Sequence, residues 1–302
     1  MEVVKMKVIS FLRNILSLHE DKNHLVLCLC GIKFKFRLKK SKFNVHTLSN
    51  KVDENRNVIF AVKSDIINEI KALNTARALH NKTFGKYKNC HAGKEVVLVA
   101  TGPTLNEYIP IEKAIHVGVN RAYMFDKITF DFLFMQDYLA VKNYIEDSIN
   151  YKNKEIKRFY GLLQPELVEN WVIPESYAIK HKAERYYARS SWAPNASNPA
   201  INFTYDISSE PLICHGSVVF PAMQFILYTN PSKIYIVGCD CSTQGYFNGP
   251  PLFPLDPDWM YRWWKELKSF AQMYYPETEI ISVNPVGLKG LFTDLYQLKD
   301  EK

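Results

Sequence analysis

The stretch VVLVATGPTL (96–105) decides the fold of this chain. Its continuous run of apolar, mostly β-branched residues predicts a strand buried on both faces, as in a parallel sheet. The turn Thr101-Gly102-Pro103-Thr104 would then lie at the carboxyl end of the strand, where open α/β sheets bind ligands. Glycine permits a close backbone approach, and the hydroxyls of Thr101 and Thr104 can hydrogen-bond a phosphate or a ribose.

Similar units follow this stretch, each an apolar run that stops in a polar residue. They are IHVGVNRAY (115–123) with Asn120 and Arg121, FDFLFMQDY (130–138) with Gln136 and Asp137, HGSVVFPAMQFILY (215–228), which leads from a turn into an apolar helix, SKIYIVGCD (232–240) with Asp240, and TEIISVNP (278–285) with Asn284. Strands that alternate with helices predict an α/β fold with a Rossmann-like, mostly parallel sheet and flanking helices. Polar residues that converge at several strand ends predict a nucleotide site.

The charge of the chain is concentrated at its start. The 302 residues are 47% apolar and carry a formal net charge of +7, which excludes a disordered or fibrous chain. Residues 1–50 hold ten Lys/Arg and three Asp/Glu, so 28 basic and 28 acidic residues remain in 51–302. This neutral body argues against a nucleic-acid enzyme, whose basic residues should line a groove along most of the fold.

The amino-terminal residues 1–80 are predicted to form a basic module, and residues 81–302 a catalytic domain. The module would contain an amphipathic helix (4–18), two strands in 25–40 that are hinged at Gly31, and a helix at 64–80. The alternating lysines of the second strand either block edge-to-edge pairing or bind anionic lipid headgroups. The second alternative predicts a cytoplasmic protein that lies at the inner face of the membrane, with residues 1–50 on the lipid.

The cysteines include two C-x-C pairs, Cys28–Cys30 and Cys239–Cys241. Alternate residues of a strand face the same way, so each pair could present two thiols to a metal. No further ligand motif accompanies them, and both pairs lie in apolar runs. Buried, reduced thiols are therefore the favoured interpretation, and no metal site is predicted.

The strand-end motifs resemble those of the bacterial sialyltransferases of glycosyltransferase family 42 and, more distantly, the MptE-like group that includes archaeal hydroxymethylpterin diphosphokinases. The matching segments lie between residues 101 and 285, in the order of the family: Thr101-Gly102-Pro103-Thr104-Leu105, Asn120 to Tyr123, His215-Gly216-Ser217, Gly238-Cys239-Asp240 with Tyr246, and Val283-Asn284-Pro285.

The resemblance implies an inverting, metal-independent glycosyltransferase with a CMP-activated donor. The donor sugar would be an acid sugar, of the sialic acid or Kdo type, and the acceptor a surface glycan or glycolipid of lipopolysaccharide or capsule. Tyr246 would stabilise the departing phosphate. Contacts to the nucleotide would come from the residues of the strand-end motifs, which are Thr101, Gly102, Pro103, Thr104, Asn120, Arg121, Gln136, Asp137, Gly216, Ser217, Asp240 and Asn284. The alternatives are an MptE-like diphosphokinase with Mg²⁺ on Asp240 or Asp137, and a relative that has lost catalysis.

The general base of the family, a histidine before the helix that leads into the last strand, is missing here. That region reads PLDPDWMYRWWKELKSF (254–270). Asp258 lies near the expected place, but Asp256 and Pro257 predict a helix start there, whose positive end would keep Asp258 ionised and make it a weak base. His215 is the second candidate, as a neutral imidazole that accepts a proton. It could equally be a structural histidine bonded within its own turn.

A lid-like insertion is predicted at about 176–211. Its segment HKAERYYARSSW (181–192) is either a solvated helix followed by a loop, or a lid whose aromatic rings stack on sugars and whose arginines pair with anions. The rings of Trp259, Tyr261, Trp263 and Trp264 cannot all be buried on one helix face, so some of them either stack on the acceptor glycan or pack against the lid.

Overall fold

The computed structural model describes residues 16–21, 24–29, 32–37, 45–163, 172–189, 201–251 and 256–297. The chain divides into two compact units, Met1–Ile66 and Ile67–Lys302. The boundary falls inside a 40-residue helix, α2 (Val45–Phe84), rather than at residue 80 as the sequence predicted. None of the helices in the described part of the chain has the length and the apolar character that a bilayer span requires.

The first unit contains a three-stranded antiparallel sheet in the order β1-β2-β3. Strands β2 (His24–Leu29) and β3 (Ile32–Arg37) pair with Leu29 opposite Ile32, which confirms the predicted hinge between two strands. The helix predicted at 4–18 is wrong at its end, because residues 16–18 belong to β1 (Leu16–Asp21), and residues 4–15 lie outside the described residues. Pairing with β2 decides the local structure there over the helical spacing of the apolar residues.

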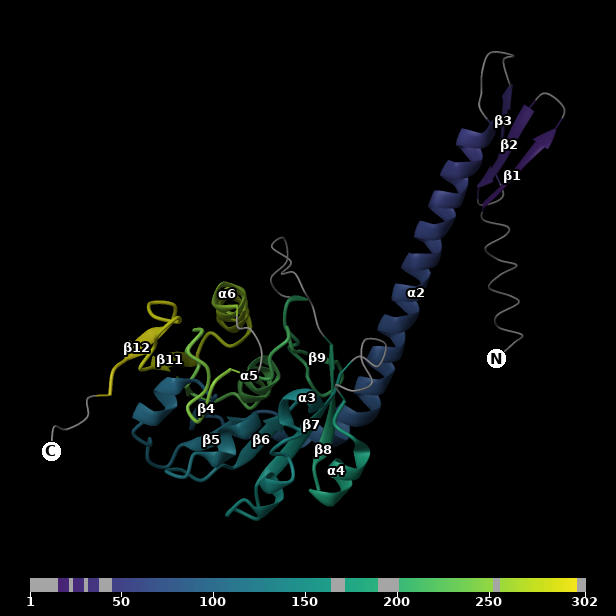
Figure 1. The fold of residues 1–302 in the computed structure, drawn as a ribbon. Coiled ribbons are helices and arrows are strands. Elements are labelled where there is room, and N and C mark those ends of the chain that lie inside the picture. Colours follow the sequence, from purple (N-terminus) through teal and green to yellow (C-terminus); the bar gives the residue numbers. More distant parts are fainter. Residues whose placement is uncertain are drawn as a thin grey trace. The chain divides into compact units, whose positions relative to one another are not determined.

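The second unit is built on one nine-stranded sheet, in the order β12-β11-β10-β4-β5-β6-β7-β8-β9 (Figure 1). Every neighbouring pair in it is parallel, which confirms the predicted α/β fold. The strands are β4 (Glu95–Val99), β5 (Ile115–Val119), β6 (Phe132–Met135), β7 (Lys157–Leu163), β8 (Glu184–Arg189), β9 (Leu212–Ile213), β10 (Lys233–Val237), β11 (Glu279–Val283) and β12 (Thr293–Leu295).

Helices cover both faces of this sheet, so alternate residues of each strand enter two separate cores. Val96 and Leu98 pack into the core formed with α5 (Val219–Tyr228), α6 (Pro257–Tyr274) and the end of α2. Val97 and Val99 pack into the other core, with α3 (Tyr138–Val141) and α4 (Glu175–Lys180). Burial on both faces explains why the strands read as continuous apolar runs. Short 3₁₀ helices complete the unit: η1 (Gly85–Tyr87), η2 (Pro103–Glu107), η3 (Asn120–Met124) and η4 (Asp147–Asn150).

Residues 184–189 correct the interpretation of 181–192 as a solvated helix. They form β8, which lies inside the sheet between β7 and β9, and Tyr186 and Tyr187 are buried in it. Both arginines of the segment, Arg185 and Arg189, belong to this strand. Arg185 donates to the carbonyl of Ile173 at 2.8 Å. The first part of the predicted lid therefore contains a helix, α4, and a strand of the main sheet, β8. Residues 190–200 lie outside the described residues.

Helix α6 begins as the sequence predicted. Asp256 accepts a hydrogen bond from the backbone N–H of Trp259 at 3.0 Å, and Pro257 occupies the first turn. Trp263 and Trp264 are both fully buried, because adjacent helical positions here face a core that wraps around the helix. Tyr261 remains exposed and Trp259 is half-buried, so only these two rings could face an acceptor.

The carboxyl-terminal part of α2 is fixed to the second unit by His80. Its Nε2 accepts the backbone N–H of Tyr187 at 2.7 Å, so Nδ1 carries the proton and donates to the carbonyls of Ile207 and Glu210, each at 2.9 Å. Burial lowers the pKa of His80 to about 4 and keeps the imidazole neutral. Phe84 completes the attachment by packing against Phe159 and Phe225.

Candidate functional site

The strand order reverses between β4 and β10. From β4 the chain proceeds through β5 to β9 on one side of the sheet, and then returns to β10, β11 and β12 on the other. In open α/β sheets, ligands bind outside the carboxyl ends of the strands at such a reversal. The residues that follow β4 and β10 are the turn Thr101–Thr104 and the segment Gly238-Cys239-Asp240, which the sequence had singled out.

Asp240 closes the turn after β4 by hydrogen bonding to Thr104. One carboxylate oxygen accepts the backbone N–H of Thr104 at 2.9 Å, and the other accepts the threonine hydroxyl. The side chain is 6% exposed, and burial raises the pKa of Asp240 while the two bonds from Thr104 oppose that rise. Asp240 and Thr104 therefore bond to each other, and their predicted contacts to a nucleotide phosphate or Mg²⁺ stay predictions.

Gly102 is required for the approach of the two loops to each other. Its N–H donates to the carbonyl of Gly238 at 2.7 Å, and a Cβ at Gly102 would lie 2.6 Å from that same carbonyl oxygen. It would also lie 2.7 Å from the carboxyl carbon of Asp240. The close approach that the sequence assigned to a phosphate is thus made by protein backbone.

Several strands leave the sheet through a residue in the left-handed region of the backbone map. These residues are Asn120 (φ 47°) after β5, Asp137 (φ 67°) after β6, His215 (φ 42°) after β9, Gly238 (φ 67°) after β10 and Asn284 (φ 47°) after β11. Glycine, asparagine, aspartate and histidine are the residues that adopt this conformation most readily. A polar residue at a strand end therefore has a backbone explanation as well as a chemical one, and each has to be judged by where its side chain lies.

Arg121 lies between two tyrosine rings at the end of β5. Its guanidinium carbon is 4.4 Å from the ring centre of Tyr246 and 5.1 Å from that of Tyr144. Nη1 donates to the side chain of Asn248 at 3.3 Å, and the residue is half-buried. No ion pair joins it to a carboxylate of the described residues. The fold thus holds a positive charge between two rings at the carboxyl edge of the sheet, and no carboxylate of the described part of the chain pairs with it.

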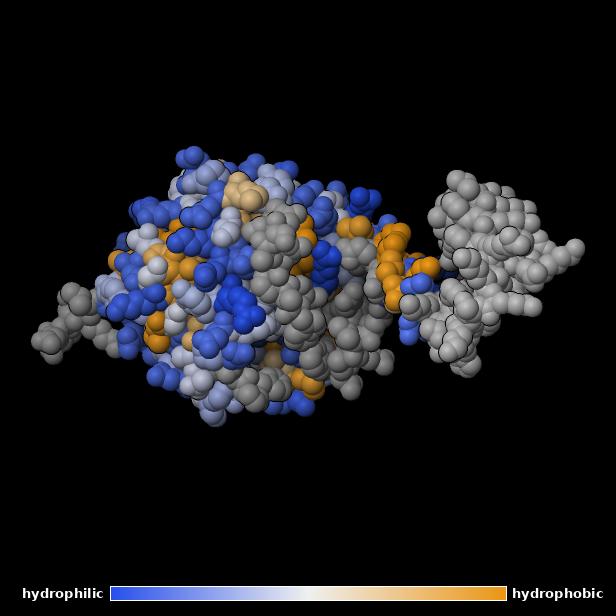
Figure 2. Space-filling view, turned by 90° about the horizontal axis from the view of Figure 1, so that it is seen from above, coloured by the Kyte–Doolittle hydropathy of each residue, from blue (hydrophilic) through white to orange (hydrophobic). Residues whose placement is uncertain are grey.

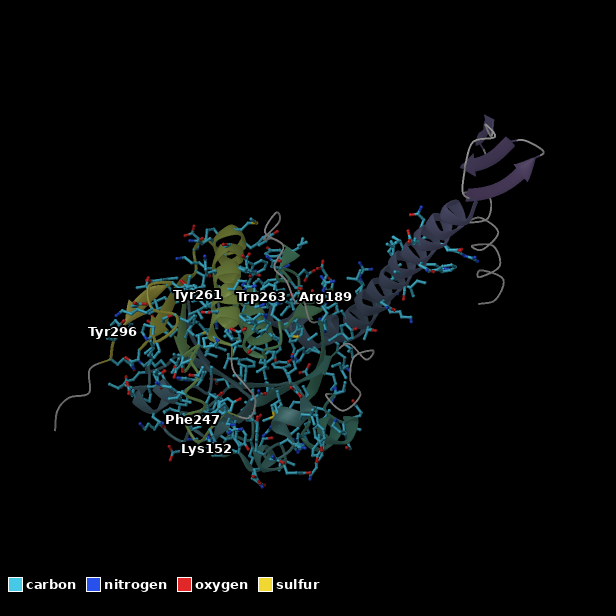
Figure 3. All side chains as sticks on the ribbon, turned by 45° about the horizontal axis from the view of Figure 1, so that its top comes forward. Lys152, Arg189, Phe247, Tyr261, Trp263 and Tyr296 are labelled. Carbon is cyan, nitrogen blue, oxygen red and sulfur yellow. The ribbon has the colours of Figure 1, made fainter. Side chains whose placement is uncertain are left out.

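The loop after β10 brings Tyr246 to this position. The N–H of Phe247 donates to the carbonyl of Thr101 at 2.8 Å, and Asn106 donates to the carbonyl of Phe247 at 2.9 Å. The Phe247 ring packs on the same side of the sheet as Phe125, and Trp263 lies on the opposite side (Figure 3). The fold therefore brings together three of the predicted site residues: Arg121, Tyr246 and Thr101.

The end of β6 adds Asp137 and buries Gln136. The Gln136 side chain accepts the Tyr186 hydroxyl at 3.0 Å and is 4% exposed, so it serves the core and not a ligand. Asp137 is half-buried and caps α3 by accepting the N–H of Leu139 at 3.1 Å. Burial raises the pKa of the Asp137 carboxyl, while its hydrogen bonds to the backbone oppose the rise. A carboxylate with a raised pKa is suited to accept a proton near neutral pH.

His215 is fully buried, which corrects its interpretation as the general base. Its ring stacks on Trp263 with ring centres 3.3 Å apart, and Nε2 is 2.8 Å from the carbonyl of Asn202. The edge of Phe203 closes another side. No substrate hydroxyl can reach an imidazole in this position, so the structural alternative holds.

The remaining predicted residues belong to other segments of the chain than Arg121. Asp258 is exposed in the first turn of α6, and Gly216 (φ 70°) is placed against the Trp259 ring, which would lie 3.0 Å from a Cβ. Ser217 follows in the turn, where its N–H donates to the carbonyl of Cys214 at 2.7 Å. Asn284 uses its side-chain oxygen to accept the N–H of Gln297 at 2.8 Å.

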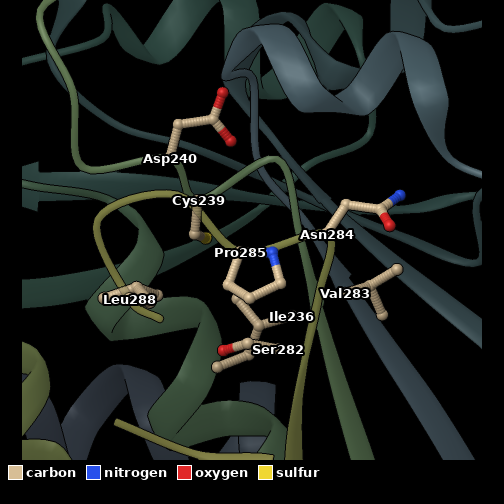
Figure 4. A pocket seen from close by; sticks show the side chains of 8 residues that line it. All are labelled: Ile236, Cys239, Asp240, Ser282, Val283, Asn284, Pro285 and Leu288. Atoms are coloured by element: carbon tan, nitrogen blue, oxygen red, sulfur yellow. The ribbon is translucent and has the colours of Figure 1, made fainter. Parts of the chain in front are cut away.

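A small pocket lies between the ends of β10 and β11 (Figure 4). Its lining includes Ile236, Cys239, Asp240, Ser282, Val283, Asn284, Pro285 and Leu288. The empty space at this pocket is about 170 Å³, part of it open to solvent, whereas ligand pockets typically hold roughly 300–1,000 Å³. It is too small for a nucleotide, and Asn284 therefore belongs to a different part of the edge from Asn120 and Arg121.

Metal ligands do not converge in the part of the chain that the structure describes, where no group of three or more His, Cys, Asp or Glu side chains is placed to hold an ion. Cys239 and Cys241 are free thiols, but both are half-buried, whereas the sequence favoured buried thiols. Burial raises the pKa of both, to about 12 for Cys241. The side chains of Cys28 and Cys30 lie outside the described residues.

Sequence reasoning missed Tyr144 and Asn248, which complete the surroundings of Arg121. Tyr144 lies in the segment between α3 and η4, and its only signal is an aromatic residue in a stretch without a motif. Asn248 is one of two residues that separate Tyr246 from Gly249. Neither residue could have been assigned to the site without the fold, because they lie 23 and 127 positions from Arg121 in the chain.

Comparisons with known proteins yield solved structures alone. No family model matches the chain, and no curated protein matches its sequence. The sialyltransferase CstII from Campylobacter jejuni, in complex with the substrate analogue CMP-3FNeuAc, aligns over 69% of this chain and 92% of its own, at 13% identity and a TM-score of 0.34. A tyrosine-to-phenylalanine variant of CST-II in complex with CMP aligns over 62% and 80%, at 14% identity and a TM-score of 0.30. At these values the likeness carries no functional argument.

Proposed function

We propose that this chain is a glycosyltransferase that takes an acid sugar from a CMP-activated donor and passes it to a hydroxyl of a surface glycan. The observation that carries the proposal is Arg121, which lies between Tyr144 and Tyr246 beside the turn that follows β4 and has no carboxylate partner in the described ranges. A fixed, unpaired guanidinium at the ligand edge of a Rossmann-like sheet is suited to bind a phosphate or carboxylate.

The distribution of charge supports an anionic donor that is recognised locally. Residues 51–302 have equal numbers of basic and acidic side chains, so no general positive field attracts the ligand. A CMP-activated acid sugar carries both a phosphate and a carboxylate. In the proposal, Arg121 and the Tyr246 hydroxyl meet the phosphate, and Thr101, Asn120, Gly216 and Ser217 contact the nucleotide.

Asp137 is the general base of this proposal. It is the half-buried carboxylate at the same edge, and burial raises its pKa, whereas His215 is enclosed in the core and Asp258 is exposed. Asp137 removes the proton of the acceptor hydroxyl, whose oxygen attacks the anomeric carbon. The bond from that carbon to the phosphate oxygen breaks, and CMP leaves with the electron pair. Attack from the face opposite to the phosphate inverts the anomeric centre, and Arg121 stabilises the charge that develops on CMP.

The experiment is a thermal-unfolding panel with CMP, CDP, UDP and ATP, each with and without Mg²⁺. We expect CMP to stabilise the chain without Mg²⁺, by about 2.7 kcal/mol when its concentration is 100 times Kd. If no cytidine nucleotide shifts the transition, the proposal is wrong. Stabilisation by ATP and Mg²⁺ alone would instead favour the MptE-like diphosphokinase, although Thr104 already occupies the Asp240 carboxylate.

Turnover separates the enzyme from a relative that only binds the donor. Release of CMP from CMP-activated sialic acid or Kdo, with lipopolysaccharide or capsule fragments as acceptors, is the expected reaction, and retention of the donor with all acceptors would contradict it. The basic residues of 1–50 are proposed to bring the protein to the cytoplasmic face of the inner membrane. Sedimentation of the chain with anionic but not with neutral vesicles is the expected result.

A further inference from the structure

Asn248 lies in the turn of a short hairpin within the loop that follows β10. The N–H of Tyr246 donates to the carbonyl of Gly249 at 2.8 Å, and the N–H of Gly249 donates to the carbonyl of Tyr246 at 3.2 Å. Phe247, which Figure 3 labels, and Asn248 occupy the two central positions of this turn. The hairpin that places the Tyr246 ring on Arg121 therefore also places the Asn248 amide beside it.

Asn248 is followed by a glycine, and this is the one Asn-Gly pair among the 302 residues of the chain. The amide of an asparagine is open to attack by the backbone nitrogen of the next residue, and a side chain on that residue hinders the approach. Glycine has no side chain. A Cβ at Gly249 would meet no atom within 4 Å, so open space surrounds this part of the backbone. The sequence and the local packing therefore both favour attack on the Asn248 amide.

The Asn248 side chain is exposed, and its hydrogen bonds are long. Oδ1 accepts Nη1 of Arg121 at 3.3 Å, and Nδ2 donates to Sδ of Met124 at 3.3 Å. The bond of 3.2 Å from the Gly249 N–H lies at the long end of the range for N–H···O bonds. Hydrophilic residues cover much of the face of the second unit in Figure 2, and water reaches an exposed amide such as that of Asn248. These contacts therefore do not lock the amide away from the backbone nitrogen or from water.

Arg121 favours the first step of this reaction. When the Gly249 nitrogen bonds to Cγ of Asn248, negative charge develops on Oδ1, which is the atom that faces the guanidinium. A donor that is already in place where charge develops stabilises the transition state. Among the described residues, no carboxylate pairs with the guanidinium and competes for it.

We propose that Asn248 is a site of spontaneous deamidation, and that the carboxylate formed there pairs with Arg121 and neutralises the positive charge of the candidate site. The Gly249 nitrogen gives its proton to the solvent and bonds to Cγ. The bond from Cγ to Nδ2 breaks, and Nδ2 takes up a proton and leaves as ammonia. Water then opens the five-membered succinimide at either of its carbonyls, which yields aspartate or isoaspartate. Each product carries one negative charge that Asn248 does not have.

The new carboxylate supplies a counter-charge to Arg121. In the aspartate product, a charged oxygen replaces the amide oxygen that lies 3.3 Å from Nη1, and bonds between a guanidinium and a carboxylate are stronger than bonds to a neutral amide. A negative charge at this place also repels a phosphate. The loss of CMP binding rests on the proposed function, whereas the deamidation and the ion pair do not depend on it.

The modification is tested by incubating the full chain in mildly alkaline buffer, followed by tryptic digestion and mass spectrometry. Asn248 is the only asparagine of the tryptic peptide 234–262, and Asn106 is the only one of the peptide 95–113. The incubation lasts until Asn248 has converted in a control that is unfolded in guanidinium. We expect conversion of Asn248 in the folded chain as well, and none of Asn106, which is also exposed but precedes Glu107. An Asn248 that keeps its amide in the folded chain would overturn the proposal.

The variant Asn248→Asp tests the consequence for the candidate site. Its affinity for CMP, measured by calorimetry, should be lower than that of the wild type by about 10-fold or more. Gln244→Glu is the matched control, because it makes the same change from amide to carboxylate at an exposed position of the same loop, and it should bind CMP as the wild type does. Equal affinities of the wild type and Asn248→Asp would contradict the neutralisation of Arg121.

A double-mutant cycle with Arg121→Gln measures the ion pair without any ligand. Asn248→Asp should change the thermal transition more favourably in the wild-type background than in the Arg121→Gln background, and added salt should reduce this difference. Equal changes in both backgrounds would show that the carboxylate does not pair with Arg121. A coupling between the two residues in a chain that binds no cytidine nucleotide would support the ion pair and contradict the proposed function.

Discussion

Two neighbouring parts of the same sheet edge use charged residues in opposite ways. At the ends of β4 and β10, Asp240 is buried and accepts the N–H and hydroxyl of Thr104, and Gly102 lets the two loops touch. At the ends of β5 and β6, Arg121 is held by rings without a counter-charge among the described residues, and the Asp137 carboxyl is only half-buried. We call the first the sealed part and the second the open part. The difference teaches that a polar strand end indicates a site only when the fold leaves its side chain unsatisfied.

The largest effect is expected in the open part, on turnover. Asp137→Asn keeps a side chain that can cap α3 but cannot take a proton, so the rate should fall by about 10²–10⁴-fold with unchanged folding. The wild-type rate should decline as the pH falls through the raised pKa of Asp137, above its ordinary 3.8, because the base must be ionised. The measurement is a pH–rate profile of both proteins. An Asp137→Asn variant with full activity would remove Asp137 from the mechanism.

The next effect is expected in the sealed part, on stability. Gly102→Ala would place a Cβ 2.6 Å from the Gly238 carbonyl oxygen, so the loops after β4 and β10 must separate. We expect a loss of about 3 kcal/mol in the free energy of unfolding, measured by urea denaturation. Gly85→Ala is the control, because its Cβ would meet no atom closer than 3.9 Å, and it should stay within about 0.5 kcal/mol of the wild type. Equal effects of both substitutions would show that the sealed part is not tightly packed.

Asp240 should behave in the same way, with a smaller effect. Asp240→Ala leaves the Thr104 N–H and hydroxyl without their acceptor, and we expect a loss of about 2 kcal/mol. Thr104→Val, which removes the hydroxyl alone, should cost about 1 kcal/mol. Denaturation of the two single variants and the double variant measures the coupling between the residues. Additive losses would contradict the bond between them, and a requirement of Asp240 for Mg²⁺ binding would contradict its role as a structural residue.

The smallest effect on folding stability is expected for Arg121 in the open part, where the change should appear in ligand binding. Arg121→Gln should weaken CMP binding by about 10–100-fold, measured by calorimetry. The affinity of this variant for CMP should no longer depend on the salt concentration. Its thermal transition without ligand should be unchanged, because Arg121 has no ion pair among the described residues to lose. Arg77→Gln removes the same charge from the exposed side of α2 and should bind CMP normally. If both variants bind equally well, Arg121 is no anion receptor.

The parallel sheet was predictable because its strands carry their own signal. Burial on both faces requires continuous apolar runs such as 96–99 and 233–237, and each run ends where the chain must turn. The start of α6 was predictable for a similarly local reason, since Asp256 caps the first turn itself. Strand β8 was not predictable, because Glu184, Arg185 and the two tyrosines that follow have the composition of a polar segment. The strand is buried only because β7 and β9 lie on either side of it.

By itself, the sequence determined the fold class, the positions of most strand ends and the uneven distribution of charge. All three can be read from short stretches of chain. Hydrophobic periodicity indicates the fold class, residues that adopt left-handed turns mark the strand ends, and residue counts give the distribution of charge. The tertiary structure alone decided what each strand-end side chain does. It buried His215 against Trp263, joined Asp240 to Thr104, and surrounded Arg121 with Tyr144, Tyr246 and Asn248. The physical reason is that a side chain is free to bind a ligand only if no partner satisfies it, and those partners come from distant parts of the chain.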